Sequence, residues 1–289
     1  MALPTAGNAD PVRPSPKEFR ADIQGLRAIA VIAVVLYHAD GGLLPGGFVG
    51  VDIFFVISGF LISGILMNEL DRGVYSLAGF YRRRVRRLFP ALYVMLAVVL
   101  AGGSILLPPG ALRELGHTAV TTVFFVSNFD FLKLSEYFAG NSQLKPLLHT
   151  WSLAVEEQFY IFFPPFLALL WWRWRKHFRL IILMVAVISL AVSAWAVRRH
   201  PSAAFYLAPS RVFELLIGVL VARAASVIVT FLGDISYSLY LWHWPFLVFG
   251  RYFFAAPLTG PQAGVLILAS MAAASVSWKF IEQIGRAHV

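Results

Sequence analysis

The sequence predicts an all-α protein, a polytopic bundle of transmembrane helices. Of its 289 residues 59% are hydrophobic and only 13% are charged, whereas an ordinary soluble domain has about a quarter charged residues. Apolar stretches of about 20 residues, long enough to cross ~30 Å of hydrocarbon as helices, recur along the chain. The net charge of +9 fits a membrane orientation better than nucleic-acid binding, because the basic residues lie mostly between apolar stretches.

The elements are expected in the following order. Residues 1–20 are rich in Pro, Ala and polar residues and lack the apolar centre of a signal peptide, which predicts a loose cytoplasmic leader. The apolar segment 117–132 is short and polar at both ends, so we expect a re-entrant half-span or surface helix there. About eight full spans are expected, at residues 22–39, 49–68, 88–107, 151–172, 178–197, 208–224, 228–249 and 262–281.

Two basic clusters predict the orientation of the bundle. Five arginines follow the second span between residues 82 and 87, and Arg173, Arg175, Lys176 and Arg179 follow the fourth. Both clusters face the cytoplasm if the N-terminus lies inside and 117–132 does not cross. The C-terminus then also lies inside, while Arg198 and Arg199 fall outside and mildly oppose this arrangement.

Arg27 and His38 are ionisable residues of the first span. They are eleven residues apart, almost three helical turns, so they share one face at a separation of about 16 Å. Ionisable residues inside a span usually face the bundle interior and mark a pathway or an active site. The alternative is that Arg27 reaches the lipid headgroups and His38 merely ends the helix.

Asp52 lies in the first turn of the second span. It can cap the helix, favoured by the helix dipole, or hold a nearby imidazole in one orientation for proton transfer. Gly59 and Ser63, four residues apart on the same span, favour close helix packing.

Arginines and glutamates provide further candidate groups. The arginine cluster after span two can mark topology and contact lipid headgroups, or bind phosphates of a soluble donor. Glu156 and Glu157 point about 100° apart on a helix, so at least one must face protein and find a partner. Arg211 is available, unless it pairs with Glu214 on its own helix.

Other candidates are weaker. Ser152 has no base placed beside it by a known signature, so a nucleophilic role is not expected. The aromatic neighbours of His243 favour interfacial packing over a role in transfer. No metal site is expected, because the histidines lack a ligand spacing with carboxylates, and the absence of cysteine excludes disulfides and thiolate chemistry.

Together, six motifs in one order resemble the membrane acyltransferase-3 family of O-acyltransferases over residues 19–282. They are Arg27-x10-His38 followed by GGFVGVDIFFVISGF, FYRRRVRRLFPAL, TWSLAVEEQFY, RVFELLIG and ISYSLYLWHWP. The resemblance implies a multi-pass enzyme of the inner (cytoplasmic) membrane. Such an enzyme transfers an acyl group, usually acetyl, from acetyl-CoA or another acyl-CoA to a carbohydrate hydroxyl. Its acceptors are cell-surface polysaccharide, lipopolysaccharide, peptidoglycan or glycolipid, and it has no permanently bound cofactor and no nucleic-acid partner.

The resemblance also implies the site residues. The catalytic groups would be His38, Asp52, Glu156 and Glu157, and the coenzyme A phosphates would be held by Arg27, Arg83, Arg84 and Arg87. As a hypothesis, His38 acts as general base on the acceptor hydroxyl or briefly carries the acyl group.

The chain departs from the family pattern at two places. Ala225 and Ser226 nearly abut the next span where the family has further helices, so about two spans are expected to be missing. The membrane domain is assigned to residues 21–283, and the short tail 284–289, with no soluble domain after it, fits a truncated chain. Two other classes stay open: a secondary transporter of a glycolipid or small anion, and an inactive truncated membrane scaffold.

Overall fold

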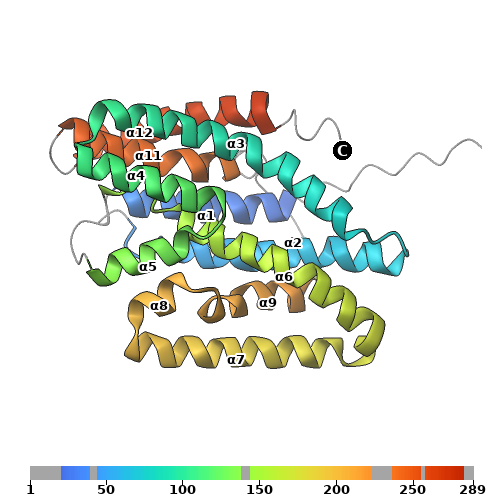
Figure 1. Cartoon of the computed structure of the whole chain (residues 1–289). Helices are drawn as coiled ribbons and strands as arrows, with labels where there is room; N and C mark the ends of the chain where they lie inside the picture. The colour runs from blue at the N-terminus through green and yellow to red at the C-terminus, as the bar shows by residue number, and fades with distance from the viewer. Residues whose placement is uncertain (1–20, 40–43, 138–143, 223–235, 255–257, 283–289) are drawn as a thin grey trace, which may run out of the picture.

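The computed structural model describes residues 21–39, 44–137, 144–222, 236–254 and 258–282, which form helices and connecting turns with no strand among them (Figure 1). The expected leader 1–20, the tail 284–289 and the link at Ala225 and Ser226 lie outside these residues. The longer helices are α1 (Ala21–Ala39), α2 (Val49–Asp71), α3 (Leu77–Leu106), α4 (Pro109–Val123), α5 (Ser127–Tyr137), α6 (Thr150–Trp174), α7 (Phe178–Arg199), α9 (Val212–Val221), α11 (Ser236–Phe254) and α12 (Gly260–Ser277). The shorter elements are η2 (Arg175–His177), α8 (Pro201–Tyr206), η3 (Ala208–Ser210) and η4 (Trp278–Glu282).

Each expected span overlaps a helix in its described residues, although the span at 208–224 contains only η3 and the short helix α9. Within the described residues, four helical stretches are long and apolar enough to cross a membrane: Val49–Asp71, Leu77–Leu106, Thr150–Arg199 and Gly260–Ile281. The third contains both α6 and α7, which run in opposite directions on either side of η2 (Figure 1). The all-helical membrane fold is confirmed, and the count of eight spans stays a prediction.

Residues 117–132 fold as the end of α4, a sharp turn and the first half of α5. Phe125 in this turn has a φ of 55°, the left-handed region that few side chains adopt. The turn is fastened to α6 because Gln158 donates a hydrogen bond to the carbonyl of Phe125 (2.9 Å) and Ser127 donates one to the carbonyl of Thr150 (3.1 Å). The pair α4–α5 therefore packs on the beginning of α6.

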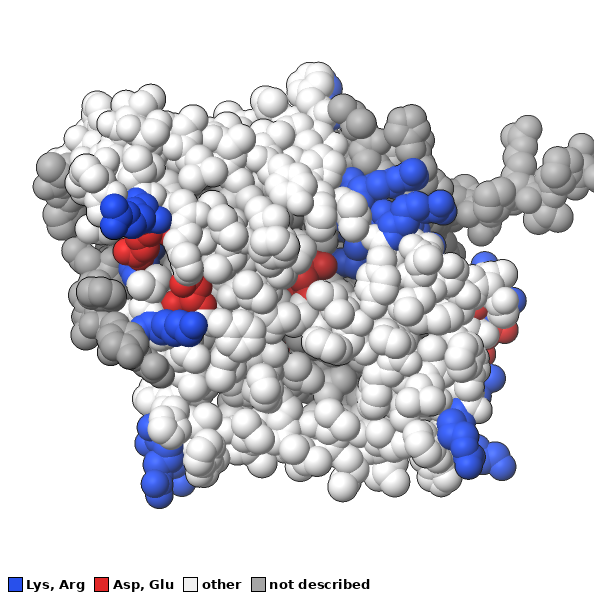
Figure 2. Space-filling model, in the orientation of Figure 1, with Lys and Arg blue, Asp and Glu red and all other residues white. Residues whose placement is uncertain are grey.

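The bundle has an apolar outer surface and polar residues inside. Large side chains of α7 and α12 are more than half exposed, among them Leu180, Ile188, Val265 and Leu268. Figure 2 shows lysines and arginines gathered mainly toward the two ends, with a broad and largely uncharged surface between them. A soluble protein would be destabilised by this surface, whereas hydrocarbon chains solvate it.

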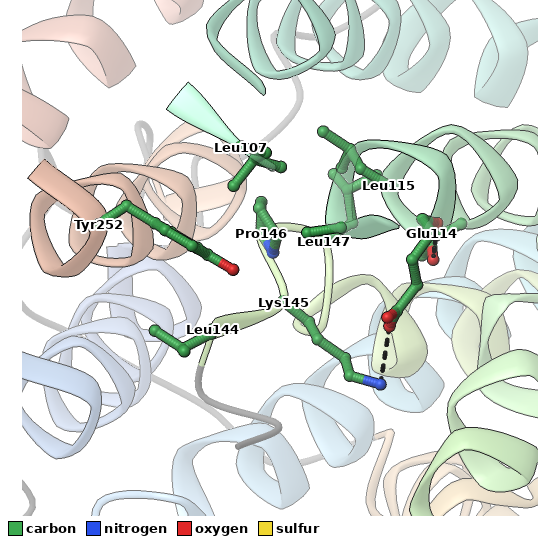
Figure 3. Close-up of a pocket in the computed structure, with 10 residues that line it drawn as sticks. Leu107, Glu114, Leu115, Leu144, Lys145, Pro146, Leu147 and Tyr252 are labelled. Atoms are coloured by element: carbon green, nitrogen blue, oxygen red, sulfur yellow. Dashed lines mark hydrogen bonds and ion pairs between the residues drawn. The ribbon is translucent and has the colours of Figure 1, made fainter. Parts of the chain in front are cut away.

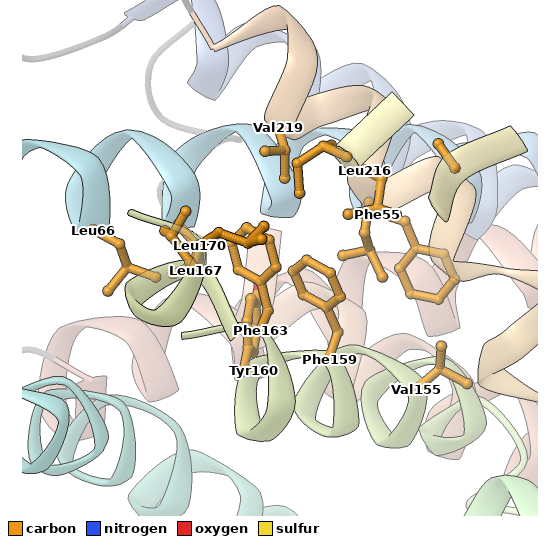
Figure 4. Close-up of a cluster of buried hydrophobic side chains, with 14 of the residues drawn as sticks. Phe55, Leu66, Val155, Phe159, Tyr160, Phe163, Leu167, Leu170, Leu216 and Val219 are labelled. Atoms are coloured by element: carbon orange, nitrogen blue, oxygen red, sulfur yellow. The ribbon is translucent and has the colours of Figure 1, made fainter. Parts of the chain in front are cut away.

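The largest buried cluster lies where α2, α6 and α9 meet. Figure 4 shows its members, including Phe55 of α2, Phe159 and Phe163 of α6 and Leu216 of α9. The rings of Phe159 and Phe163 are stacked with centroids 4.5 Å apart. Tight apolar packing of this kind holds α6 in a fixed rotation about its axis, which fixes the direction of its polar side chains.

Glycines allow α2 and α9 to approach closely. A Cβ atom on Gly59 would overlap the backbone carbonyl of Leu215, and one on Gly218 would overlap that of Val56. The close packing that the sequence predicted for Gly59 is therefore present, with α9 as its partner.

Two consecutive prolines interrupt the backbone hydrogen bonds of α6. Pro165 has no N–H, so the carbonyl of Ile161, four residues earlier, loses its helical donor. The Tyr81 hydroxyl of α3 donates to this carbonyl at 2.7 Å, and the Tyr75 hydroxyl donates to the carbonyl of Pro164 at 3.0 Å. A neighbouring segment thus satisfies a backbone group that lipid could not.

Candidate active site

Two histidines from opposite ends of the sequence meet inside the bundle. His38 lies in the last turn of α1, and its Nδ1 is 3.2 Å from Nε2 of His243 in α11. The edge of the Trp244 indole contacts His38, with ring centroids 4.5 Å apart. His243 is fully buried whereas His38 is half-buried. The packing of α1 on α11 thus leaves one accessible imidazole supported by an inaccessible one.

A polar stripe on α6 begins beside this pair. His149 immediately precedes α6, and Ser152, Glu156 and Tyr160 follow at spacings of three or four residues, which places them on one helix face. Ser152 is hydrogen bonded to the Tyr240 hydroxyl, which donates to the carbonyl of His149 at 2.5 Å. The stripe therefore contacts α11 one turn before His243.

Farther along α6 the stripe reaches a carboxylate. Glu156 accepts hydrogen bonds from the Ser58 hydroxyl of α2 and from the Tyr160 hydroxyl (2.5 Å). These two donors satisfy one oxygen of a half-buried charge in a helix that is otherwise apolar. Glu156 is thus turned toward protein, as the sequence predicted for at least one of the two glutamates.

The adjacent Glu157 pairs with the arginine cluster. Its carboxylate lies 2.6 Å from Nη2 of Arg84, both side chains are largely buried, and the Arg84 guanidinium is 3.6 Å above the Tyr160 ring. Arg87, one turn along α3, interacts electrostatically with Glu157. Arg83 pairs with Glu69 at 2.5 Å near the surface. The structure thus brings together four of the sequence-predicted residues, Arg84, Arg87, Glu156 and Glu157.

The other predicted residues lie elsewhere. Arg27 is half-buried on α1 and donates to Gln24 at 2.9 Å. Asp52 pairs with Arg211 at 2.9 Å, and the same guanidinium pairs with Glu214 at 2.9 Å. No hydrogen bond joins Asp52 to His38, although both are described, so the expected orienting contact is absent. The glutamates of α6 are likewise not the partners of Arg211.

A pocket of about 260 Å³ lies between the end of α3, α4, α11 and the segment that precedes α6 (Figure 3). Its polar groups are Thr118, Tyr252 and the ion pair of Lys145 with Glu114 (2.8 Å), and leucines and Pro146 form much of its wall. The Trp244 indole, which contacts His38, donates to the carbonyl of Lys145 at 2.7 Å. One aromatic residue therefore links the pocket to His38.

Three residues of this site were missed or undervalued in the sequence. The sequence favours interfacial packing for His243 and gives His149 only a capacity for hydrogen bonding, and it predicts no role for Tyr240. The signals were present as spacing: Tyr240 and His243 are three residues apart, and His149, Ser152 and Glu156 follow a helical repeat. The spacing does not reveal that this face of α6 contacts the face of α11 that contains Tyr240 and His243.

A bundle with a lipid-facing apolar exterior and a buried row of histidine, tyrosine, glutamate and arginine belongs to the class of integral membrane proteins with an internal polar site. The chain belongs to the family described as acyltransferase domain, whose sequence model matches residues 20–227.

Curated relatives agree with this family. The peptidoglycan O-acetyltransferase OatA of Listeria monocytogenes is 39% identical over 213 residues, which cover 71% of this chain and 34% of the relative. The O-acetyltransferase OatA of Staphylococcus aureus NCTC 8325 is 34% identical over 204 residues, 69% of this chain and 34% of the relative. The chain thus aligns with about a third of the length of these relatives. No solved structure matches it.

Proposed function

We propose that this chain is a membrane O-acyltransferase that transfers an acyl group, most simply acetyl, from acyl-CoA to a hydroxyl of a carbohydrate or glycolipid. The observation that supports this most directly is the His38–His243 pair, a half-buried imidazole held by a buried one, in a chain of the acyltransferase family. The relatives named as O-acetyltransferases support acetyl as the group and oxygen as its destination.

The arginine end of the bundle is proposed to bind the donor. The clusters at residues 82–87 and 173–179 favour a cytoplasmic location of this end in the inner membrane, with the N-terminus inside. Arg83 is half-exposed and its ion pair with Glu69 is near the surface, so a phosphate can replace the carboxylate at little cost. Arg84 is fixed by Glu157 and Tyr160, and its buried Nε has no hydrogen-bond partner among the described residues, so this guanidinium would add positive charge behind the phosphate. Arg27 and Arg87 would add charge around the same donor.

At the other end, His38 is proposed to act on the acceptor. Its free ring nitrogen takes the hydroxyl proton as the hydroxyl oxygen attacks the thioester carbonyl. The C–O bond forms, the C–S bond breaks, and the coenzyme A thiolate leaves and takes up that proton, which returns the imidazole to its neutral form. Detection of an acyl group on His38 would reassign it as a carrier in two successive transfers.

The pocket beside Trp244 is proposed to hold part of the acceptor. Lys145, Glu114 and Tyr252 provide hydrogen-bond donors and acceptors within a largely apolar wall, a combination that suits a sugar with its hydroxyl edges and apolar faces. Its volume of about 260 Å³ is just below the range of about 300–1,000 Å³ for sites of drug-sized ligands. One sugar unit rather than a long segment is therefore the expected occupant.

The test uses purified protein in lipid vesicles with acetyl-labelled acetyl-CoA and a glycan fragment. We expect label in the glycan and release of coenzyme A, and a loss of roughly 100-fold or more in His38→Ala. His117→Ala is the matched control, because His117 is exposed and its ring pairs with Asp130 rather than with the His38–His243 pair. Near-normal transfer by His38→Ala would remove this residue from the mechanism. Uptake of substrate without ester formation would identify a transporter, and neither activity would favour a scaffold.

A further inference from the structure

The role of His38 depends on which of its ring nitrogens holds the proton. A neutral imidazole has one N–H donor and one acceptor nitrogen, and hydrogen-bond partners decide which is which. His38 and His243 share one hydrogen bond, which joins Nδ1 of His38 and Nε2 of His243. The partners of the remaining nitrogen of His243 settle the direction of this bond.

His243 has only acceptors at its other nitrogen. Its Nδ1 lies 2.7 Å from the backbone carbonyl of Tyr240 and 3.2 Å from that of Leu239. A carbonyl oxygen cannot donate, so Nδ1 of His243 must be the protonated nitrogen. His243 is fully buried and no described carboxylate pairs with it, which favours the neutral ring. Its Nε2 is therefore an acceptor.

The tautomer of His243 determines which nitrogen of His38 is protonated. Because Nε2 of His243 accepts, the hydrogen bond of 3.2 Å requires an N–H at Nδ1 of His38. A neutral His38 then has its lone pair at Nε2, on the side of the ring away from the buried partner. His38 is half-buried, and Nε2 is the ring nitrogen left to accept a proton from a hydroxyl group.

We propose that His243 is a positioning residue that holds His38 in the tautomer protonated at Nδ1, so that Nε2 is the nitrogen that reacts. This proposal rests on the proposed acyltransferase activity and adds the residue that prepares His38 to accept a proton from the hydroxyl group. It assigns to the YLWHWP segment a part in the reaction that differs from interfacial packing. The backbone carbonyls of α11 thus determine both tautomers, because they fix the proton of His243 at Nδ1.

His149 shows that burial alone does not create this role. It is as deeply buried as its neighbours and its ring lies 5.8 Å from that of His243. Yet neither of its ring nitrogens has a hydrogen-bond partner among the described residues. The cluster thus contains one histidine that is hydrogen bonded to His38 and one that only packs beside them.

The experiment compares two substitutions of similar volume at position 243 in lipid vesicles. His243→Leu removes the acceptor, and we expect kcat to fall at least about tenfold with little change in KM for acetyl-CoA. His243→Gln can still accept from Nδ1–H of His38 through its amide oxygen, so we expect it to regain much of the lost kcat. Equal kcat values for Leu and Gln at that position, with both variants folded in a thermal unfolding assay, would overturn the proposal.

A second measurement needs no variant of His243. Nitrogen-15 NMR of histidine-labelled protein, with the His38→Gln variant to identify the signals, reports which nitrogen of His38 is protonated. We expect the Nδ1–H form in the wild type, and the Nε2–H form would overturn the assignment even if the variants fail to fold. A wild type that is inactive toward acetyl-CoA would instead contradict the proposed function, so the two failures are distinguishable.

Discussion

The ion pair of Arg84 and Glu157 contributes to the stability of the bundle as well as to the site. This pair is largely buried, and removing one partner of such a pair leaves an uncompensated charge away from water. Such a loss typically destabilises a protein by about 3–5 kcal/mol, whereas removing both partners costs much less. The pair therefore contributes to a fixed arrangement of α3 and α6 as well as to charge.

This leads to a prediction for single and double variants. Arg84→Met or Glu157→Met should each lower the free energy of unfolding by about 3 kcal/mol or more, and the double variant should be less destabilised than the sum of the two. Unfolding in mixed detergent micelles, followed by circular dichroism, measures the difference. Arg82→Met, at an exposed position of the same helix, should change stability by less than about 0.5 kcal/mol. Additive losses at positions 84 and 157 would contradict the coupling.

The sequence predicted single site residues better than their partners. His38 and Glu157 were recognisable because an ionisable group in an apolar run must face protein. Their partners His243 and Arg84 lie 205 and 73 residues away, and such pairings depend on how helices rotate and pack. Asp52 illustrates the limit: local sequence allowed a helix cap or a histidine partner, whereas the packed bundle gives it Arg211. Its catalytic role stays a prediction.

At the scale of elements, the contact between α2 and α9 depends on glycine. Gly59→Ala would place a methyl group against the Leu215 carbonyl, and overpacking of this kind typically costs about 1–3 kcal/mol. Gly64→Ala is the matched control, because it lies on the same helix with no atom within 4 Å of the added Cβ. We expect a lower melting temperature for Gly59→Ala. Gly64→Ala should be neutral or stabilising by up to about 1 kcal/mol, since alanine favours helix. Equal effects of the two changes would show that the close approach is not a constraint.

The proline break in α6 provides a second test. Tyr81→Phe removes the donor to the Ile161 carbonyl, and a carbonyl that is left without a partner away from water costs about 1–3 kcal/mol. Tyr93→Phe, on the same helix at an exposed position, should have little effect on stability. The relevant measurement is detergent unfolding of both variants side by side. A Tyr81→Phe protein as stable as the wild type would indicate that water or lipid headgroups reach this carbonyl.

The helices themselves were largely foreseeable. The apolar runs predicted α1, α2, α6, α7 and α12 with ends within a few residues, because length and hydropathy decide which segments can exist in lipid. The span expected at residues 88–107 lies almost wholly within α3, but this helix begins earlier, at Leu77, and also includes the arginine cluster. An amphipathic arginine-rich segment can continue a helix beyond the apolar region, and hydropathy does not detect this extension.

At the scale of the whole molecule, the orientation can be measured directly because the chain has no cysteine. Gly46 and Arg72 are both exposed and flank α2, whose 23 residues extend over about 35 Å. With a membrane-impermeant maleimide, we expect Gly46→Cys to react in intact cells and Arg72→Cys only in inverted vesicles. Labelling of both from one side would exclude a span at α2. The reverse pattern would place the N-terminus outside.

The polar stripe of α6 has one further consequence for the molecule as a whole. His149, Ser152, Glu156 and Tyr160 belong to or adjoin the same rigid rod, which contacts Tyr240 at one end and Arg84 at the other. Tyr240 and the Arg84 guanidinium therefore contact the same helix, so a rotation of α6 about its axis would change both contacts at once.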